Sequence, residues 1–213
     1  VAATAIIGGI YYFFGKSDTI YNENDIYQKE GLYYEKGTDD LADGMSKKYS
    51  YSGVILSETP LEDGKPSGVE KEYYPSGSLK HEFEYADGKR SGSQKQYSED
   101  GKLIMEVTFA DGKPTGVEKS YYESGSLRRE TPFTDGLING IEKRYYKTGQ
   151  ILDETPYENG KRNGVRKGYQ ETGELYVEVT YKDGNPVDGY IYQKDGSKEK
   201  LTQNMYFKLF GMN

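Results

Sequence analysis

The sequence predicts an all-β fold, an elongated single-layer antiparallel sheet that is built from successive β-hairpins. A motif of 24 residues recurs six times in strict phase, and such a period is typical of repeat arrays whose units contact only their neighbours. Each motif has two short runs of strand-forming residues with Gly-containing turns between them. No stretch of the array has the i, i+3, i+4, i+7 apolar spacing of an amphipathic helix.

Numbering the 24 positions of the motif from its first glycine shows which of them are constant among the six copies. Lys occupies position 4, Tyr position 6, Gly position 10 and Glu position 15 of every copy. Position 12 is Leu or Ile, position 18 is Leu or aromatic, and positions 20 and 21 are Asp-Gly, with Asn159 as the exception. Position 1 is always Gly: Gly44, Gly68, Gly92, Gly116, Gly140 and Gly164.

The copy at residues 68–91 illustrates how one motif forms a hairpin. Residues 69–74 and 79–85 are the predicted strands. The turn at Pro75-Ser76-Gly77 fits a three-residue loop that a left-handed glycine closes. Asp87-Gly88 is the stronger turn signal, because this pair favours positive φ where strands reverse.

The length of the first loop predicts which side chains share a face. A three-residue loop sets position 6 opposite position 12 and position 2 opposite position 16. Strand alternation then places positions 2, 4, 6, 12, 14, 16 and 18 on one apolar face, and the charged positions on the other. A loop one residue longer would instead set Lys at position 4 opposite Glu at position 15. We favour the first register because it segregates the apolar residues.

Position 17 is proline in three copies, at Pro60, Pro132 and Pro156. Proline has no N–H to donate to a ladder and belongs at bulges, strand ends or edges. We therefore expect the second strand of these hairpins to be short and to splay around position 17.

The N-terminal segment differs from the array. Residues 1–16 begin with an uncharged apolar run at residues 1–14, which we interpret as a helical apolar anchor or signal-anchor remnant. The alternatives are the apolar region of a signal peptide and a buried strand or helix of an assembly. The anchor interpretation predicts a membrane-anchored protein of the cell envelope with its repeats outside the cytoplasm. Without an anchor, the expected location is cytoplasmic.

The remaining boundaries follow from the phase of the motif. Residues 17–43 are predicted to form a linker and an N-terminal capping hairpin near residues 25–37. Residues 44–188 hold the six repeats, and residues 189–213 a C-terminal capping hairpin and an apolar tail. The hairpin turns at Asp195-Gly196. We expect the tail to cover the last sheet edge, although it also fits a docking segment.

Composition argues against several functional classes. A net charge of −7 argues against nucleic-acid binding, which calls for a basic footprint. The chain has no cysteine, hence no disulfide framework and no thiolate metal site. His81 is the only histidine, and it occupies a variable position, which makes it a poor general base. We therefore predict no enzymatic activity, no catalytic residue, no metal and no cofactor.

The constant tyrosines and lysines, with the tyrosines at position 7, are the candidate interaction surface. Tyr provides rigid contact area with a polar tip, and Lys can bind phosphates or acidic partners. The simpler interpretation is that the position-6 tyrosines form the sheet's own core and that the lysine stems pack between them. Position 7 is then the better candidate for variable contact. The residues are Tyr73, Tyr74, Tyr97, Tyr121, Tyr122, Tyr145, Tyr146, Tyr169, Lys71, Lys95, Lys119 and Lys143.

The repeats resemble the MORN repeat variant. The resemblance covers Gly44 to Gly189 and is clearest at GVEKEYYPSGSL from Gly68 and at GIEKRYYKTGQI from Gly140. It implies successive β-hairpins in a twisted antiparallel sheet and a role in protein–protein or membrane-associated contact. Bacterial chains of this kind are often grouped as YwqK-type antitoxins. Lys at position 4 departs from the aromatic residue of many such repeats.

These observations predict a non-enzymatic, membrane-anchored repeat scaffold for protein–protein interaction on the cell envelope. Its partner is expected to be another protein or a second copy of the chain, with the membrane contacted through residues 1–14. One alternative is an antitoxin or immunity protein that binds a toxin. Another is a glycan- or cell-surface-binding module, against which the absence of Trp counts.

Overall fold

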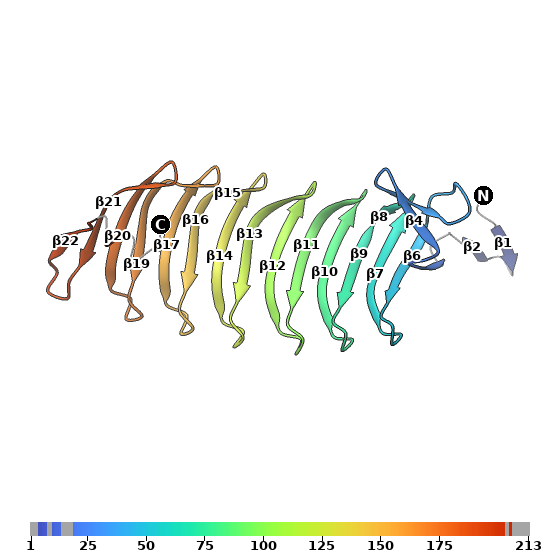
Figure 1. Cartoon of the computed structure of the whole chain (residues 1–213), viewed down its shortest axis with the longest axis horizontal. Helices are drawn as coiled ribbons and strands as arrows, with labels where there is room; N and C mark the ends of the chain where they lie inside the picture. The colour runs from blue at the N-terminus through green and yellow to red at the C-terminus, as the bar shows by residue number, and fades with distance from the viewer. Residues whose placement is uncertain (1–3, 8–9, 14–18, 203–204, 206–213) are drawn as a thin grey trace. The chain divides into compact units, whose positions relative to one another are not determined.

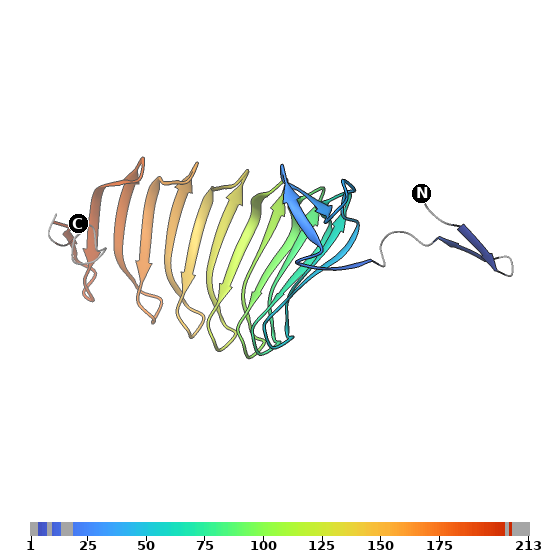
Figure 2. The ribbon, with the colours of Figure 1, turned by 45° about the vertical axis from the view of Figure 1, so that its right-hand side comes forward.

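The computed structural model describes residues 4–7, 10–13, 19–202 and 205. The chain divides into two compact units. The first comprises Val1–Leu103 with Thr108–Lys113, and the second comprises Ile104–Val107 with Pro114–Asn213. Strand β12 (Leu103–Ala110) contributes residues to both. Figure 1 labels the strands, and Figure 2 shows the successive hairpins from a second direction.

In the first unit, β3 pairs in parallel with β6, and the strands from β6 to β11 then pair antiparallel in chain order. A separate hairpin, β4–β5, lies before β6. The bounds are β1 Thr4–Ile7, β2 Ile10–Phe13, β3 Ile20–Asn22, β4 Ile26–Lys29, β5 Leu32–Glu35, β6 Gly44–Tyr49, β7 Ile55–Glu62, β8 Lys65–Pro66, β9 Gly68–Tyr73, β10 Leu79–Ala86 and β11 Lys89–Tyr97.

In the second unit, the strands from β13 to β22 pair antiparallel in chain order. The all-β prediction of successive hairpins is therefore confirmed. The bounds are β13 Lys113–Tyr121, β14 Leu127–Thr134, β15 Leu137–Ile138, β16 Gly140–Tyr145, β17 Ile151–Glu158, β18 Lys161–Arg162, β19 Gly164–Tyr169, β20 Leu175–Lys182, β21 Asn185–Tyr192 and β22 Lys198–Lys200.

Both predicted turns form. Asp87 and Gly88 have φ of 50° and 74°, which are the left-handed values of the turns that match strand twist. Asn159, the exception to Asp, has φ of 50° as well, because Asn tolerates this region almost as readily. The first turn ends at Gly77 with φ of 89°, and its N–H donates to the carbonyl oxygen of Tyr74 at 2.8 Å.

The predicted register holds only at the tip of each hairpin. Tyr73 lies opposite Leu79, so position 6 does face position 12. The register then shifts by one residue between Leu79 and His81, and Lys71 comes to lie opposite Glu82. The shift recurs in the other hairpins whose pairing the structure describes. It is a β-bulge, in which two residues of one strand oppose one residue of the other.

The bulge moves half of each hairpin to the other face. Paired residues share a face and side chains alternate along a strand, so a one-residue slip exchanges the faces of all later positions. The predicted apolar face of seven positions is therefore wrong. Positions 2, 4, 6, 12, 15 and 17 share what we call the ladder face. Positions 3, 5, 14, 16 and 18 share the other, the cavity face.

Proline at position 17 interrupts the strand that follows it in the chain and not the strand that contains it. Strands β7, β14 and β17 contain the prolines and still run for 8 residues, so the expected shortening is wrong. The strand that follows each of them is split in two, as β8/β9, β15/β16 and β18/β19. The carbonyl oxygen of Pro132 accepts a bond from the N–H of Asn139. In a β-strand, the N–H and C=O of one residue point to the same side. An N–H at position 132 would therefore also face the next strand, and because Pro132 has none, that strand loses one hydrogen bond there.

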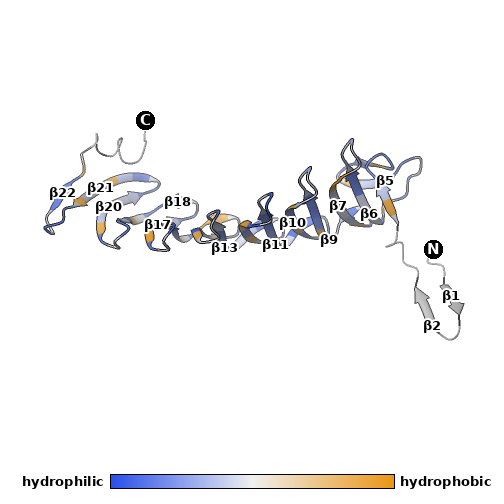
Figure 3. Cartoon of the chain, turned by 90° about the horizontal axis from the view of Figure 1, so that it is seen from below, coloured by the Kyte–Doolittle hydropathy of each residue, from blue (hydrophilic) through white to orange (hydrophobic). Residues whose placement is uncertain are grey.

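Each end of the array has a small apolar cluster. Tyr21, Ile26, Ala42 and Leu61 are buried together in the first unit, with Tyr33 packed against them. In the second unit Leu201 packs on Val177, Val179 and Tyr181, with Met205 against this cluster. Figure 3 shows how short the hydrophobic stretches are elsewhere in this largely hydrophilic chain.

Both capping hairpins form, β4–β5 within residues 25–37 and β21–β22 at the other end. Leu201 and Met205 pack on the cavity face of β20, although the tail was expected to cover an edge. The rest of the tail, at residues 203–204 and 206–213, lies outside the described residues.

The predicted N-terminal helix is not supported. Residues Thr4–Ile7 and Ile10–Phe13 are two strands of an antiparallel hairpin, and the rest of residues 1–16 lies outside the described part. β-branched and aromatic residues favour strands, and the Gly8-Gly9 pair between these two runs is a hairpin signal in the sequence. Within the described residues, no helix has the length and apolar character needed to cross a bilayer.

Candidate functional site

The ladder face has a row in which Lys and Glu alternate across the strands. Glu58 lies opposite Lys47 on one side and Lys71 on the other. The Lys47 Nζ and Glu58 Oε1 atoms are 2.8 Å apart, and burial leaves about a fifth of each side chain exposed, at 20% and 23%. The second unit has a row of the same kind, in the order Lys119, Glu130, Lys143, Glu154, Lys167 and Glu178.

The position-6 tyrosines join each hairpin to the one before it. The Tyr73 hydroxyl donates to Glu58 at 2.7 Å, and Tyr145 donates to Glu130 at 2.6 Å. Burial, and then the bond to the carboxylate, raises the pKa of Tyr73 and of Tyr145 to about 12. Equivalent bonds join Tyr97 to Glu82, Tyr121 to Glu106 and Tyr169 to Glu154.

The Glu58 carboxylate is thus held from two directions, by Lys47 and by Tyr73. The pKa of Glu58 is lowered, first by the hydrogen bond from Lys47 and then by the one from Tyr73. Lys47, Glu58 and Tyr73 therefore form one hydrogen-bonded network. In the other described hairpins the constant Lys also lies opposite the constant Glu, so the Lys–Glu pairing that we had set aside is the one observed.

The position-7 tyrosines also bond within the fold. The Tyr74 hydroxyl donates to the carbonyl oxygen of Tyr97 at 3.0 Å. Tyr122 donates to the carbonyl of Tyr145 at 2.6 Å and Tyr146 to that of Tyr169 at 2.8 Å. These rings connect neighbouring hairpins, so they do not stand free as we expected of a variable contact position.

The structure places the twelve residues of the candidate surface in both units. Tyr73, Tyr74, Tyr97, Lys71 and Lys95 lie in the first unit, and the other seven lie in the second. All eight of these tyrosines are half-buried. Their hydroxyl groups are engaged internally, so what they offer a partner is mainly ring edge.

Beside the ladder, the second unit has a row of aliphatic side chains that sequence reasoning did not single out. Val117, Ile141 and Val165 occupy position 2 and are 46%, 51% and 43% exposed. Val117 lies opposite Pro132, and Ile141 lies opposite Pro156. We call these five residues the aliphatic row. The signal was present in the sequence, because position 2 is aliphatic in most copies of a strongly polar chain.

The cavity face of the second unit has a different chemistry. At positions 5 and 14, Ser120 lies opposite Arg129, Arg129 opposite Arg144, and Arg144 opposite Asp153. The Asp153 carboxylate is 1% exposed and binds the guanidinium groups of both Arg144 and Arg166. The bond to Asp153 raises the pKa of Arg144 above its ordinary value. Arg129 pairs with Glu118 at 3.1 Å.

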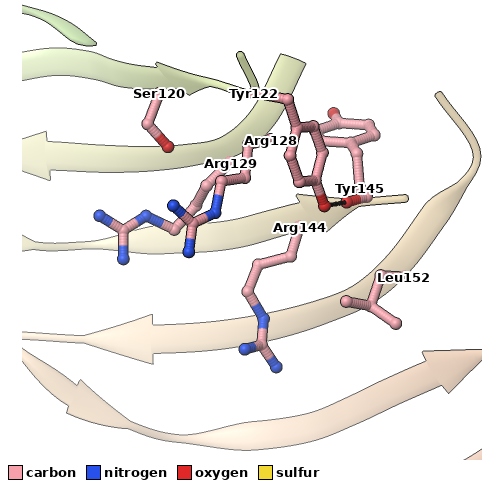
Figure 4. A pocket seen from close by; sticks show the side chains of 7 residues that line it. All are labelled: Ser120, Tyr122, Arg128, Arg129, Arg144, Tyr145 and Leu152. Carbon is pink, nitrogen blue, oxygen red and sulfur yellow. Dashed lines mark hydrogen bonds between the residues drawn. The ribbon is translucent and has the colours of Figure 1, made fainter. Parts of the chain in front are cut away.

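A cavity of about 410 Å³ opens over this row. Arg128, Arg129 and Arg144 line it together with the rings of Tyr122 and Tyr145, as Figure 4 shows. Ser120 and Leu152 complete the lining. Arg128 and Arg129 are consecutive, and plain alternation would separate them. The bulge at position 13 brings both to the same cavity.

Sequence reasoning missed this cavity because it weighed the constant positions. Positions 5, 13 and 14 vary among the copies, and arginines gather there only in the fourth and fifth repeats, at Arg128, Arg129 and Arg144. A search for like charges at variable positions would have found them.

The only histidine has a local role. The His81 Nδ1 atom lies 2.8 Å from Glu72 Oε2, and the ring packs on Phe83 with centroids 5.3 Å apart. Across the part of the chain that the structure describes, no group of three or more His, Cys, Asp or Glu residues has the arrangement of a metal site.

Comparison with known proteins identifies the repeats. The family model for the MORN repeat variant matches residues 66–87, 90–111, 114–135, 138–159 and 162–183. The first copy of the motif lies outside these matches, although β6 and β7 pair with the same register. No curated protein sequence matches the chain.

One solved structure to which the chain is similar shares little of its sequence and shape. It is a crystal structure of a point mutant of S. aureus TarM in complex with fondaparinux, alpha-GlcNAc-glycerol and UDP. It is 10% identical, with a TM-score of 0.16, over 62% of this chain. The match spans 19% of the TarM chain.

Proposed function

The chain belongs to the MORN repeat variant family, and on that basis we propose that it is a non-enzymatic scaffold that binds a protein partner. Repeats of this family are generally protein- or membrane-interaction modules. The proposal assigns the contact to the ladder face of the second unit, and specifically to the aliphatic row.

The exposure of that row is the observation that carries the proposal. Three aliphatic side chains, each more than two-fifths exposed, recur at one position of consecutive hairpins: Val117, Ile141 and Val165. Contiguous apolar surface of this kind marks interaction sites, and the core of an interface is depleted of charge. The tyrosines beside the row are held by the glutamates, so with the neighbouring lysines they can form a polar rim.

The charge pattern favours a protein over a lipid surface. Lys and Glu alternate beside the aliphatic row, so this part of the face has no excess of positive charge. The chain as a whole carries a net charge of −7. Anionic membranes attract clusters of basic residues, whereas a protein partner can match alternating charges one by one.

The test is a cross-linked pull-down from native extracts with the full chain as bait, read by mass spectrometry. We expect a stoichiometric protein partner that is lost with Ile141→Lys, which puts a charge in the row. Val187→Lys is the matched control, because Val187 is 60% exposed and lies outside the row. Capture that both variants retain would overturn the assignment. Flotation of the chain with anionic vesicles, abolished by Ile141→Lys alone, would point to membrane contact instead.

The finer predictions extend this proposal. Membrane anchoring through residues 1–14, with the repeats outside the cytoplasm, predicts that protease added to intact cells degrades the repeats. Full protection of the repeats would exclude that orientation. Toxin binding and glycan binding remain alternative identities of the partner, and a toxin would appear in the pull-down as a tight one-to-one complex.

A further inference from the structure

The arginine-lined cavity of the second unit is distinct from the aliphatic row, because none of the five residues of that row lines it. We propose that this cavity binds a small organic ester of phosphate or sulfate. The charged oxyanion sits among Arg128, Arg129 and Arg144, and the organic body packs against the aromatic end of the cavity.

The arrangement of charges is the first argument. Arg129 and Arg144 lie directly opposite each other on neighbouring strands, and like charges in this relation are destabilising. Arg128 adds a third positive charge, and no acidic side chain pairs with it among the described residues. Glu118 and Asp153 already pair with Arg129 and Arg144, and a bound dianion would add negative charge beside the unpaired Arg128.

The two existing ion pairs leave donors available. Glu118 accepts from a single nitrogen of Arg129, its Nη2 atom. Arg144 likewise donates to Asp153 through its Nη2 atom. Each guanidinium has five N–H donors in a fixed fork, which suits bidentate contact with phosphate-type oxygens. Both arginine side chains remain 44% exposed, so a ligand can reach them.

The opposite end of the cavity fits an apolar or aromatic group. The Tyr122 hydroxyl is engaged by the Tyr145 carbonyl, and the Tyr145 hydroxyl by Glu130. The two rings therefore present their carbon surface, and Leu152 adds to it. A volume of about 410 Å³ is in the range of cavities that bind small organic molecules, and it exceeds what a bare anion needs.

The site is particular to these hairpins and does not follow from the motif. In the second repeat, the residues equivalent to Arg128, Arg129 and Arg144 are Lys80, His81 and Gln96. In the fifth repeat they are Leu152, Asp153 and Gly168. Three arginines therefore line one cavity here, while the constant positions of the motif are unchanged.

The test is titration calorimetry of the full chain with four probes: phenyl phosphate, phenyl sulfate, inorganic phosphate and phenol. We expect saturable one-to-one binding of at least one ester, at least about tenfold weaker binding of inorganic phosphate, and no measurable binding of phenol. The two esters distinguish a phosphate from a sulfate ligand. Failure of both esters to bind would overturn the proposal. Equal binding of inorganic phosphate and of the esters would show that the organic group makes no contribution, and would overturn the assignment of an organic ester.

Two variants locate the binding. Arg128→Gln should weaken ester binding by about tenfold or more, because a hydrogen bond to a charged group is lost, and the exposed Arg128 side chain has no structural partner to disturb. Lys161→Gln removes the same charge at an exposed position outside the cavity and should leave the affinity within about twofold. Equal losses in both variants would mean non-specific attraction and would refute the site. Unchanged binding by Arg128→Gln would do the same.

Discussion

The two faces of the hairpin sheet are built from different kinds of repeat position. On the ladder face, the same Lys, Tyr and Glu recur in every copy, and Lys47, Tyr73 and Glu58 show how they can bond to one another. On the cavity face, positions 5, 13 and 14 differ from copy to copy. In the second unit these variable positions bring arginines to a cavity.

The difference teaches where stability and specificity reside in such a chain. A single-layer sheet has little apolar core, so a repeated polar network joins each hairpin to the next one. Its residues recur in every copy, since each copy meets a neighbour with the same constant residues. The variable positions are released from this requirement and can form one individual site.

The largest expected effect is on the cavity face, at its buried carboxylate. Asp153→Ala removes the partner of Arg144 and Arg166, and breaking a buried ion pair from one side costs about 3–5 kcal/mol. We expect a loss of this size in the free energy of unfolding, measured by urea denaturation. Glu123→Ala, at an exposed side chain, is the control and should stay within about 0.5 kcal/mol. Similar values for both variants would mean that Asp153 does not organise this face.

High pH should act on the ladder face. The pKa of Tyr73, Tyr121 and Tyr145 rises from the ordinary 10.0 to about 12 in the fold. The folded state therefore holds these protons more tightly than the unfolded state. Their contribution to stability is complete below pH 10.0 and is lost as the pH rises toward about 12.

Thermal unfolding midpoints across this pH range, together with the ultraviolet absorbance of tyrosinate, test the effect. A group of tyrosines should ionise late and only as the sheet unfolds. If all tyrosines titrated near their ordinary pKa while the fold persisted, the hydroxyl–carboxylate bonds would be absent from the ladder.

Loss of a single Tyr–Glu hydrogen bond of the ladder face should lower the free energy of unfolding less than loss of the buried Asp153 carboxylate. Tyr145→Phe removes one hydroxyl that donates to Glu130 at 2.6 Å, and a hydrogen bond to a charged group is worth about 1.5–3 kcal/mol when buried and less at this half-buried site. We expect about 1 kcal/mol in urea denaturation. Tyr176→Phe is the matched control, because its hydroxyl makes no hydrogen bond among the described residues. A cost for Tyr145→Phe above that of Asp153→Ala would reverse the comparison of the two faces.

The smallest effect is expected at position 17. Pro132→Thr gives this copy the residue that Thr108 and Thr180 have in theirs, and the strands after those two are unbroken. The restored N–H should join β15 and β16, slow amide hydrogen exchange near Asn139, and change the free energy of unfolding by less than about 1 kcal/mol. Exchange near Asn139 that is as fast as in the unaltered chain would show that the break has another cause.

The sequence by itself determined the all-β class, the hairpin repeat and both turns. These features depend on local chemistry: Asp87-Gly88 adopts left-handed values, and the first loop sets Tyr73 opposite Leu79. Only the tertiary structure decided the faces, because a one-residue bulge leaves no trace in a pattern of period two and yet moves every later side chain. The Lys47–Glu58–Tyr73 network and the cavity that Arg128, Arg129 and Arg144 line depend on that shift. Both features bring together residues of different strands, and the distances between those residues are set only when neighbouring hairpins pair.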